Sequence, residues 1–232
     1  FIEHRTGNDE AACAEITLAL EMLEPLGGGT LLWYGGLAAL IFAHAGRPEQ
    51  ARAQVELQEA RLRDLSASAL PARSARAALG LAYAALEDPA GAVRHAGLLE
   101  PYLDDYHWTP VRRTLAGAAA LAGATVEAIA LLREAEVIAR REGLMPDLGL
   151  VLLERGQLMP QGAERRSVIE EAEQVLAALG MRREAALARA ALAARGRALL
   201  PGGLSAREAE VLRLVAMGRS NRETATALVI SE

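Results

Sequence analysis

The chain has 232 residues, carries a formal net charge of −5, and is 52% hydrophobic but only 3% aromatic. Its apolar residues are mostly Ala and Leu, which favour helices over strands, so the composition predicts an all-α fold. All 25 basic residues are arginine, which excludes chemistry that requires a lysine, such as a P-loop, a Schiff base or a Ser-Lys dyad. The negative charge gives no global basic field, so nucleic acid would have to bind at a local surface.

Cys13 is the single cysteine, which rules out an internal disulfide, and its apolar helix face predicts a small buried residue. No run of about 18 uninterrupted apolar residues suggests a membrane span, because the densest stretch, 31–45, contains Gly35, Gly36 and His44. The N-terminus lacks a signal-peptide pattern. We therefore expect a cytoplasmic protein without a membrane partner. The first residue is not Met and the last residues enter a helix start, so both ends are interpreted as cuts in a longer protein.

A six-residue turn recurs along most of the chain. It begins at Gly7, Gly46, Glu87, Gly123 and Gly162, at intervals of 39, 41, 36 and 39 residues. A glycine at the first position can end the preceding helix in a left-handed conformation. Pro48 and Pro89 suit the first turn of the helix that follows, where a missing N–H is tolerated. The pattern predicts a repeat of about 39 residues.

Two helices are predicted between successive turns, and a closing helix follows the last pair. The predicted helices are Thr30–Ala45, Pro48–Leu65, Ala72–Leu86, Pro89 to about Leu103, Thr109–Ala122, Thr125–Glu142, Pro146–Leu158, Ala163–Leu179 and about Arg182–Arg195. The G-x-P-x-x-A turn and the small residues on facing helices resemble tetratricopeptide-type repeats, although the spacing exceeds their 34-residue unit. The resemblance implies an α-solenoid over residues 1–198 with a concave binding surface. A plain helical spacer is the alternative.

A different pattern follows residues 199–203, a predicted linker that ends in Pro-Gly-Gly. Three helix N-caps are predicted, at Ser205 with Glu208, at Ser220 with Glu223, and at Ser231. Gly218 is placed to end the first of these helices. Two short helices and a third N-cap, separated by turns of a few residues, are typical of a helix-turn-helix. We therefore predict an incomplete helix-turn-helix domain over residues 204–232.

These residues resemble the LuxR-type DNA-binding domain, whose pattern contains L-[ST]-x-R-E-x-E-V-L and, further on, G-x-[ST]-N-x-E. The matching residues are Leu204, Ser205, Arg207, Glu208, Glu210, Val211, Leu212, Leu214, Val215, Ala216, Gly218, Ser220, Asn221, Glu223, Ala225, Leu228, Ile230 and Ser231. Thr224 departs from the pattern, which has Ile at that position. The resemblance implies a transcription regulator that binds promoter DNA, as a dimer on paired half-sites, while the repeats sense an effector ligand or bind a protein partner.

In this family the recognition helix would begin at about Ser231, so the base-reading residues are expected after Glu232. The candidate DNA-binding residues within the chain are Ser220, Asn221, Arg222 and Ser231. They lie at predicted helix N-termini, where backbone N–H groups favour phosphate anions. Helix capping alone is the alternative role for Ser220, Asn221 and Ser231.

Helical repeats followed by such a domain resemble the large ATP-binding regulators of bacteria. The resemblance implies an ATPase module upstream of Phe1. The chain itself contains no G-x-x-x-x-G-K loop, and we expect it to hold no cofactor. An interaction scaffold without DNA binding is the alternative function.

No acid, base and nucleophile are predicted to converge, so we expect no catalytic residues and no enzyme activity. Asp104, Asp105 and His107 lie close together, but no further ligand pair has a spacing that fits a metal. A solvated turn before the next helix is favoured, and no metal site is expected.

The remaining histidines and aromatic residues are predicted to be structural. His44 and His95 are interpreted as tolerated helix residues, and His4 as part of a frayed terminus. Trp33 and Tyr34 could line a ligand groove, but core packing is the favoured role.

Overall fold

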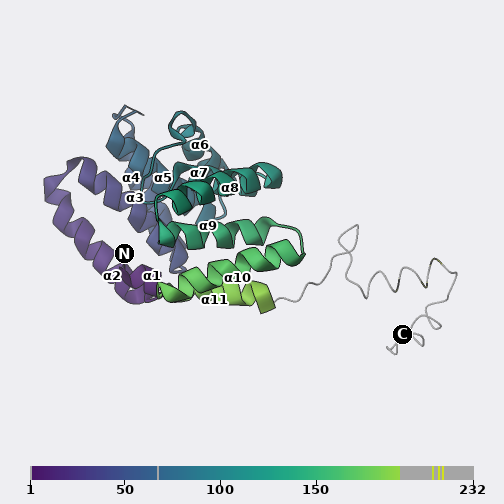
Figure 1. Cartoon of the computed structure of the whole chain (residues 1–232). Coiled ribbons are helices and arrows are strands. Elements are labelled where there is room, and N and C mark those ends of the chain that lie inside the picture. Colours follow the sequence, from purple (N-terminus) through teal and green to yellow (C-terminus); the bar gives the residue numbers. More distant parts are fainter. Residues whose placement is uncertain (1, 67, 194–210, 212–213, 215, 217–232) are drawn as a thin grey trace. The chain divides into compact units, whose positions relative to one another are not determined.

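The computed structural model describes residues 2–66, 68–193, 211, 214 and 216 (Figure 1). The chain divides into two compact units, Phe1–Ala191 and Leu192–Glu232. Within the described residues the structure is all-helical, and the one β-type contact is an isolated bridge between Tyr106 and Pro110. The predicted all-α fold is confirmed.

The helices follow one another with short connections. They are α1 (Ile2–Thr6), α2 (Asp9–Leu23), α3 (Gly28–His44), α4 (Pro48–Leu62), α5 (Leu70–Ala85), α6 (Pro89–Gly97), α7 (Val111–Leu121), α8 (Thr125–Arg141), α9 (Met145–Leu158), α10 (Ala163–Ala178) and α11 (Arg182–Ala193), with 3₁₀ turns η1 (Glu24–Leu26) and η2 (Glu100–Tyr102). All nine helices predicted from the sequence are present, and most of the described helix ends lie within three residues of the predicted ones.

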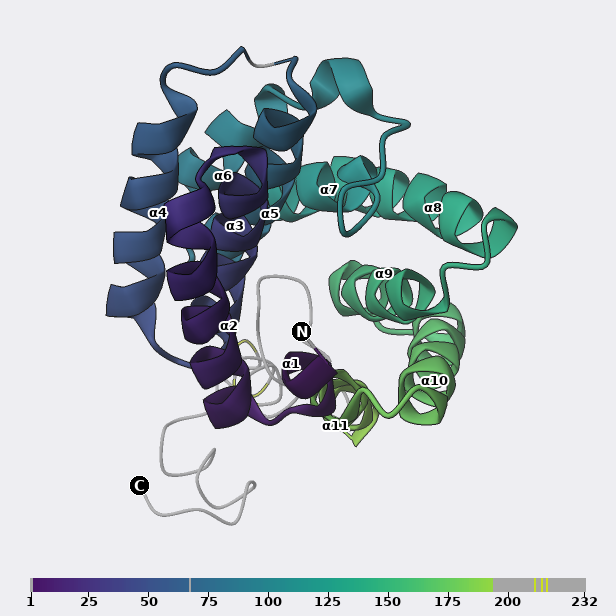
Figure 2. The ribbon, with the colours of Figure 1, turned by 90° about the vertical axis from the view of Figure 1, so that its left-hand side faces the viewer.

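Neighbouring helices pack as pairs, and the pairs pack in succession. The pairs are α3 with α4, α5 with α6, α7 with α8, and α9 with α10. The first helix of each of the first three pairs packs on the next, α3 on α5 and α5 on α7. The last pair is joined through α9, which packs on α8 (Figure 2). The described residues before α11 therefore form a helical-repeat array, as predicted.

The recurring turn ends helices by a shared backbone geometry. Four of the five predicted turns begin at a residue with positive φ, namely Gly7 at 82°, Gly46 at 70°, Glu87 at 57° and Gly123 at 80°. At Gly46, for example, Arg47 N donates to Phe42 O and Gly46 N to Ala43 O, the bond pair of a Schellman motif. Gly162 differs, because its φ of 162° is extended and it stands before α10 as the N-cap. The weakest copy of the turn therefore starts a helix instead of ending one.

One predicted helix is shorter than expected. The sequence predicts a helix from Pro89 to about Leu103, but α6 ends at Gly97 and a 3₁₀ turn covers Glu100–Tyr102. Pro101 has no N–H to continue an α-helical ladder and its ring clashes with the preceding turn, whereas it fits at the start of a new turn.

Small residues allow the first helices to approach closely. A Cβ on Gly36 of α3 would lie 3.0 Å from both Ala75 O and Ala78 Cβ of α5. In the next step of the array, a Cβ on Gly80 of α5 would lie 2.5 Å from the Thr114 methyl carbon of α7. Single glycines therefore set how closely α3, α5 and α7 approach one another in succession.

The first and last helices of the Phe1–Ala191 unit lie side by side (Figures 1 and 2). Arg183 of α11 donates to Asp9 Oδ1 of α2 at 3.0 Å and also to His44 O at the end of α3. A Cβ on Gly7 would be 3.6 Å from Arg183 N. The array is therefore closed by contact between its ends, which the repeat pattern did not predict.

His4 lies at this closure and is only 2% exposed. Its Nε2 is 3.3 Å from Nδ1 of His44, and the two rings are stacked with centroids 5.3 Å apart. The prediction that His4 belongs to a frayed terminus is wrong, because its side chain is buried against His44 of α3.

Candidate functional site

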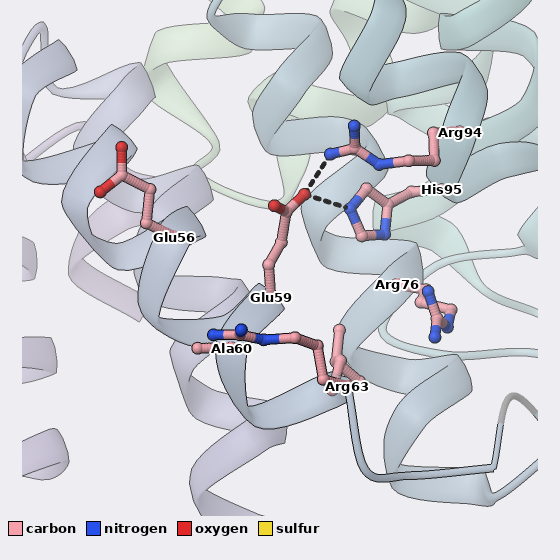
Figure 3. Close-up of a pocket in the computed structure, with 8 residues that line it drawn as sticks. Glu56, Glu59, Ala60, Arg63, Arg76, Arg94 and His95 are labelled. Atoms are coloured by element: carbon pink, nitrogen blue, oxygen red, sulfur yellow. Dashed lines mark hydrogen bonds and ion pairs between the residues drawn. The ribbon is translucent and has the colours of Figure 1, made fainter.

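A pocket of about 350 Å³ lies between the second helices α4 and α6 and the first helix α5 (Figure 3). It is lined by Glu56, Glu59, Ala60, Leu62 and Arg63 of α4 and its C-cap, by Arg76 of α5, and by Arg94 and His95 of α6. Most of these side chains are charged, unlike the small apolar residues at the contacts between first helices. The pocket is within the size range of small-molecule sites.

Glu59 is the acceptor at the centre of the pocket. Tyr83 Oη donates to Glu59 Oε1 at 2.6 Å, and Arg94 also donates to this oxygen. Burial raises the pKa of Glu59, but the hydrogen bonds from Tyr83, His95 and Arg94 outweigh burial and lower the pKa overall. Glu59 therefore stays ionised at neutral pH, with its charge matched by donors of the protein.

His95 is 2% exposed and binds Glu59 through one edge of its ring. Its Nε2 lies 3.1 Å from Glu59 Oε1. Because an ionised carboxylate can only accept, Nε2 carries the proton. Burial lowers the pKa of His95 by more than Glu59 raises it, so the ring is neutral and Nδ1 is an acceptor. Nδ1 is buried and has no hydrogen-bond partner among the described residues.

Arg76 lies apart from the Glu59 carboxylate in Figure 3, where the dashed contacts of Glu59 run to Arg94 and His95. Its Nε is buried and has no hydrogen-bond partner among the described residues. Burial lowers the pKa of Arg76, and only the charge of Glu59 opposes that effect. An arginine stays protonated in proteins, so the pocket wall holds a cation without a bonded acceptor in the described part of the chain.

The first turn of α6 explains how the donors reach Glu59. Asp88 caps this helix by accepting from Gly91 N at 3.0 Å. Gly91 lets the Tyr83 ring lie against the helix, because a Cβ there would be 2.2 Å from Tyr83 Cδ1. The ring of His95, one turn later, stacks on Tyr83 with centroids 5.4 Å apart. The close approach at Gly91 and the stacking of His95 on Tyr83 therefore position both donors.

Sequence reasoning placed His95 on a helix but missed this cluster. Glu59 and His95 are 36 residues apart, and the sequence holds no short motif that joins them. The available signal was the repeat itself, since both residues lie on second helices of successive pairs. The pattern indicates which helices are neighbours but not which side chains meet.

His107 is buried at 4% exposure, so a solvated turn is the wrong description of this residue. Its Nδ1 lies 3.0 Å from Ser74 Oγ, and its Nε2 lies 3.1 Å from Asp105 Oδ2. Asp104 is solvated as predicted, with its side chain 93% exposed. In the described residues no group of three or more His, Cys, Asp or Glu side chains could hold a metal ion.

Ser74, His107 and Asp105 form a serine–histidine–carboxylate row that resembles a nucleophilic triad in composition. Ser74 is only 1% exposed, so its hydroxyl faces no substrate space. Asp105 also pairs with Arg73 of α5 at 2.8 Å. The row therefore fastens the connection between η2 and α7 onto α5.

The aromatic residues of α3 have a mixed role. Trp33 and Trp108 have ring centroids 4.9 Å apart, and Tyr34 meets Trp108 edge-on at 6.0 Å. Trp33 is nevertheless 39% exposed, so the favoured core role describes only part of its surface. Cys13 is 1% exposed and free, as expected for a small core residue.

The predicted DNA-binding residues Ser220, Asn221, Arg222 and Ser231 lie outside the described residues. Three residues of the preceding predicted helix are described, namely Val211, Leu214 and Ala216, and all three are helical. None of the described helices is long and apolar enough to cross a membrane.

Comparison with known proteins identifies one segment. Residues 203–232 match the family described as GerE, bacterial regulatory proteins of the luxR family. No curated protein and no solved structure matches the chain. The C-terminal segment is therefore similar to luxR-family regulatory proteins, which agrees with the resemblance found in the sequence.

Proposed function

We propose that this chain is part of a bacterial transcription regulator, in which residues 204–232 contribute to a DNA-binding domain and residues 1–198 form the sensing region. The luxR-family match over residues 203–232 carries the proposal. It covers both predicted capping boxes, which set the spacing of a helix-turn-helix.

In this proposal the regulator acts on promoter DNA in the cytoplasm and has no enzyme activity of its own. Ser220, Asn221, Arg222 and Ser231 are the proposed contacts to the DNA backbone, because predicted helix N-termini present N–H groups to phosphate. Binding as a dimer would place two such domains on paired half-sites.

The helical array is the proposed sensor for an effector ligand or protein partner. Two features support this role. The array holds a pocket with a charged lining between α4, α5 and α6. Its last described helix, α11, also ends at Ala193, shortly before the predicted linker at residues 199–203.

The test is selection of DNA by the natural full-length protein that contains these residues. The tagged protein is incubated with a pool of random duplexes, and bound DNA is amplified and sequenced over several rounds. We expect enrichment of a sequence with two half-sites, and affinity that falls steeply as salt is raised. Failure to enrich any sequence would contradict DNA binding and favour the interaction scaffold.

The proposed contact residues are tested by the variants Asn221→Ala and Arg222→Ala. Loss of a phosphate contact should weaken binding to all sequences by a similar factor, because such contacts position the domain and read no bases. Arg141→Ala, an exposed residue of α8 in the array, is the matched control and should bind as the wild type does. Equal binding by all three variants would remove these residues from the interface.

A further inference from the structure

Two polar atoms of residues that line the α4–α6 pocket lack hydrogen-bond partners in the described part of the chain; the Nε atoms of Arg73 and Arg155 lack them too, but both of those arginines form ion pairs. Arg76 Nε is a donor and His95 Nδ1 is an acceptor, and neither has a hydrogen-bond partner among the described residues. Both atoms are buried, although both residues line the pocket. A buried polar group without a partner costs free energy, so a ligand that supplied a partner to either atom would gain affinity.

Glu59 does not fill this role for either atom. Its Oε1 already accepts from Tyr83, Arg94 and His95 Nε2. No hydrogen bond or ion pair joins Glu59 to Arg76, which it influences only through its charge.

Arg76 is half-buried and has no ion pair among the described residues, whereas the buried arginines Arg113 and Arg155 each have one. Arg113 binds Glu154 at 2.6 Å, and Arg155 binds Glu136 at 2.7 Å. Arg63, at the C-terminal end of α4, is a second pocket arginine without an ion pair among the described residues. With His95 neutral, the arginines Arg63, Arg76 and Arg94 outnumber the carboxylates Glu56 and Glu59, so the pocket has an excess of positive charge.

We propose that this pocket binds a small hydroxylated organic anion, whose carboxylate or phosphate group pairs with Arg76 and whose hydroxyl group donates to His95 Nδ1. Guanidinium groups bind both kinds of oxyanion through paired hydrogen bonds. The volume of about 350 Å³ suits a metabolite and is too small for a folded partner. The inference rests on the proposed function, since it names the ligand class that the array would sense.

The experiment is a titration of the full chain, without DNA, by isothermal calorimetry and thermal unfolding at constant ionic strength. The probes are L-lactate, glycerol 3-phosphate and propionate. Lactate and glycerol 3-phosphate each carry an oxyanion and a hydroxyl, so at least one should bind saturably and raise Tm by about 2 °C or more. Their relative affinity distinguishes a carboxylate ligand from a phosphate ligand. Propionate lacks the hydroxyl and should bind more weakly than lactate if the carboxylate is preferred.

Substitution of Arg76 tests the anion contact. Arg76→Gln should weaken binding about tenfold or more, because a charge-assisted hydrogen bond is lost. Arg76→Lys should restore part of the affinity, since it keeps the charge but loses the planar fork. Arg141→Gln, exposed on α8 and outside the pocket, is the matched control and should bind as the wild type does. Without ligand, Arg76→Gln should unfold at the same or a higher temperature, because an unpaired buried donor is removed.

Two results would overturn the proposal. One is the absence of saturable binding for both hydroxylated probes, and the other is unchanged affinity in Arg76→Gln. If the site prefers a carboxylate, equal affinities for propionate and lactate would overturn the His95 contact. Failure of the pocket and failure of the proposed function are distinguishable: selection of DNA without probe binding rejects only the pocket, and probe binding without selection of DNA rejects only the regulator.

Discussion

Arg113 shows how the array holds a buried charge. It is 8% exposed, and its Nε and Nη2 donate to Glu154 at 3.0 and 2.6 Å, while Nη1 donates to Thr109 Oγ1 at 3.2 Å. Burial lowers the pKa of Arg113, but Glu154 outweighs that effect and the pKa is raised. The pair joins α7 to α9, so its loss affects two successive repeats.

Glu154→Gln should destabilise the protein by about 2–3 kcal/mol, because it leaves the buried Arg113 without its counter-charge. This is below the usual cost for a fully buried pair, since the Glu154 side chain is 34% exposed. The measurement is urea unfolding followed by circular dichroism. Glu170→Gln is the matched control, because it breaks the exposed ion pair with Arg166 and should cost less than about 0.5 kcal/mol. Equal losses in both variants would contradict the importance of burial.

His95 and His107 should make the protein sensitive to mild acid. Burial lowers the pKa of both rings below the ordinary value of 6.5. As the pH falls below about 6.5, the unfolded chain takes up protons on these rings before the folded chain does, so proton uptake favours unfolding. The free energy of unfolding should therefore fall between pH 7 and 5.5, by at most about 1.4 kcal/mol per pH unit for each ring.

Urea unfolding at several pH values checks this expectation, and the informative variant is His107→Gln. This variant should lose stability at pH 7, because Ser74 and Asp105 lose a partner, but its stability should change less between pH 7 and 5.5. A wild-type stability that is flat over this range would refute the neutral state assigned to the buried rings.

Individual helices depend on close approach at single glycines, and α6 offers a matched pair. In Gly91→Ala the new Cβ would be 2.2 Å from the Tyr83 ring, so we expect a loss of about 1–3 kcal/mol from overpacking. Gly97→Ala lies on the same helix with nothing within 4 Å of the added atom. It should be neutral or stabilising by up to about 1 kcal/mol, because alanine is the better helix former. Thermal unfolding of both variants compares them, and a destabilised Gly97→Ala would contradict the packing argument.

The helices themselves were largely predictable because their boundaries are local. Gly46 and Gly123 end helices through hydrogen bonds within a few residues, and Pro48 sits at the start of the next helix. The shortened α6 was missed because the pattern of apolar residues continues past Gly97, although Pro101 is a local signal for its end. Local chemistry therefore accounts for most of the element boundaries.

The pocket was not predictable in the same way. Glu59, Tyr83 and His95 come from three helices, and they meet only because Gly91 sets how closely α5 and α6 approach. Nothing near any of these residues in the sequence indicates the other two. The DNA-binding residues differ again, since Ser220 and its neighbours were inferred from a family pattern and stay predictions.

At the scale of the Phe1–Ala191 unit, Arg183 connects the two ends of the array. Arg183→Gln should weaken the contact of α11 with α2 and α3, because the bonds to Asp9 and to His44 O are lost. Hydrogen exchange should become faster in α1 and α11 and stay unchanged in α5 and α7. Arg189→Gln is the control on the same helix, because Arg189 pairs with Glu173 on an exposed surface. Unchanged exchange in α1 would show that Arg183 does not hold the closure.

The contact of α11 with α2 and α3 also affects how the unit unfolds on heating. In an open row of repeats, each terminal unit has one neighbour, so the ends fray first and the row can lose its repeats stepwise. Here each end of the array packs against the other, so neither end has only one neighbour. Fraying of either end breaks the contact between Gly7 and Arg183. The loss of structure at one end is therefore coupled to the other end. Loss of the first repeat should therefore promote loss of the last, and heat should melt both in a single cooperative transition.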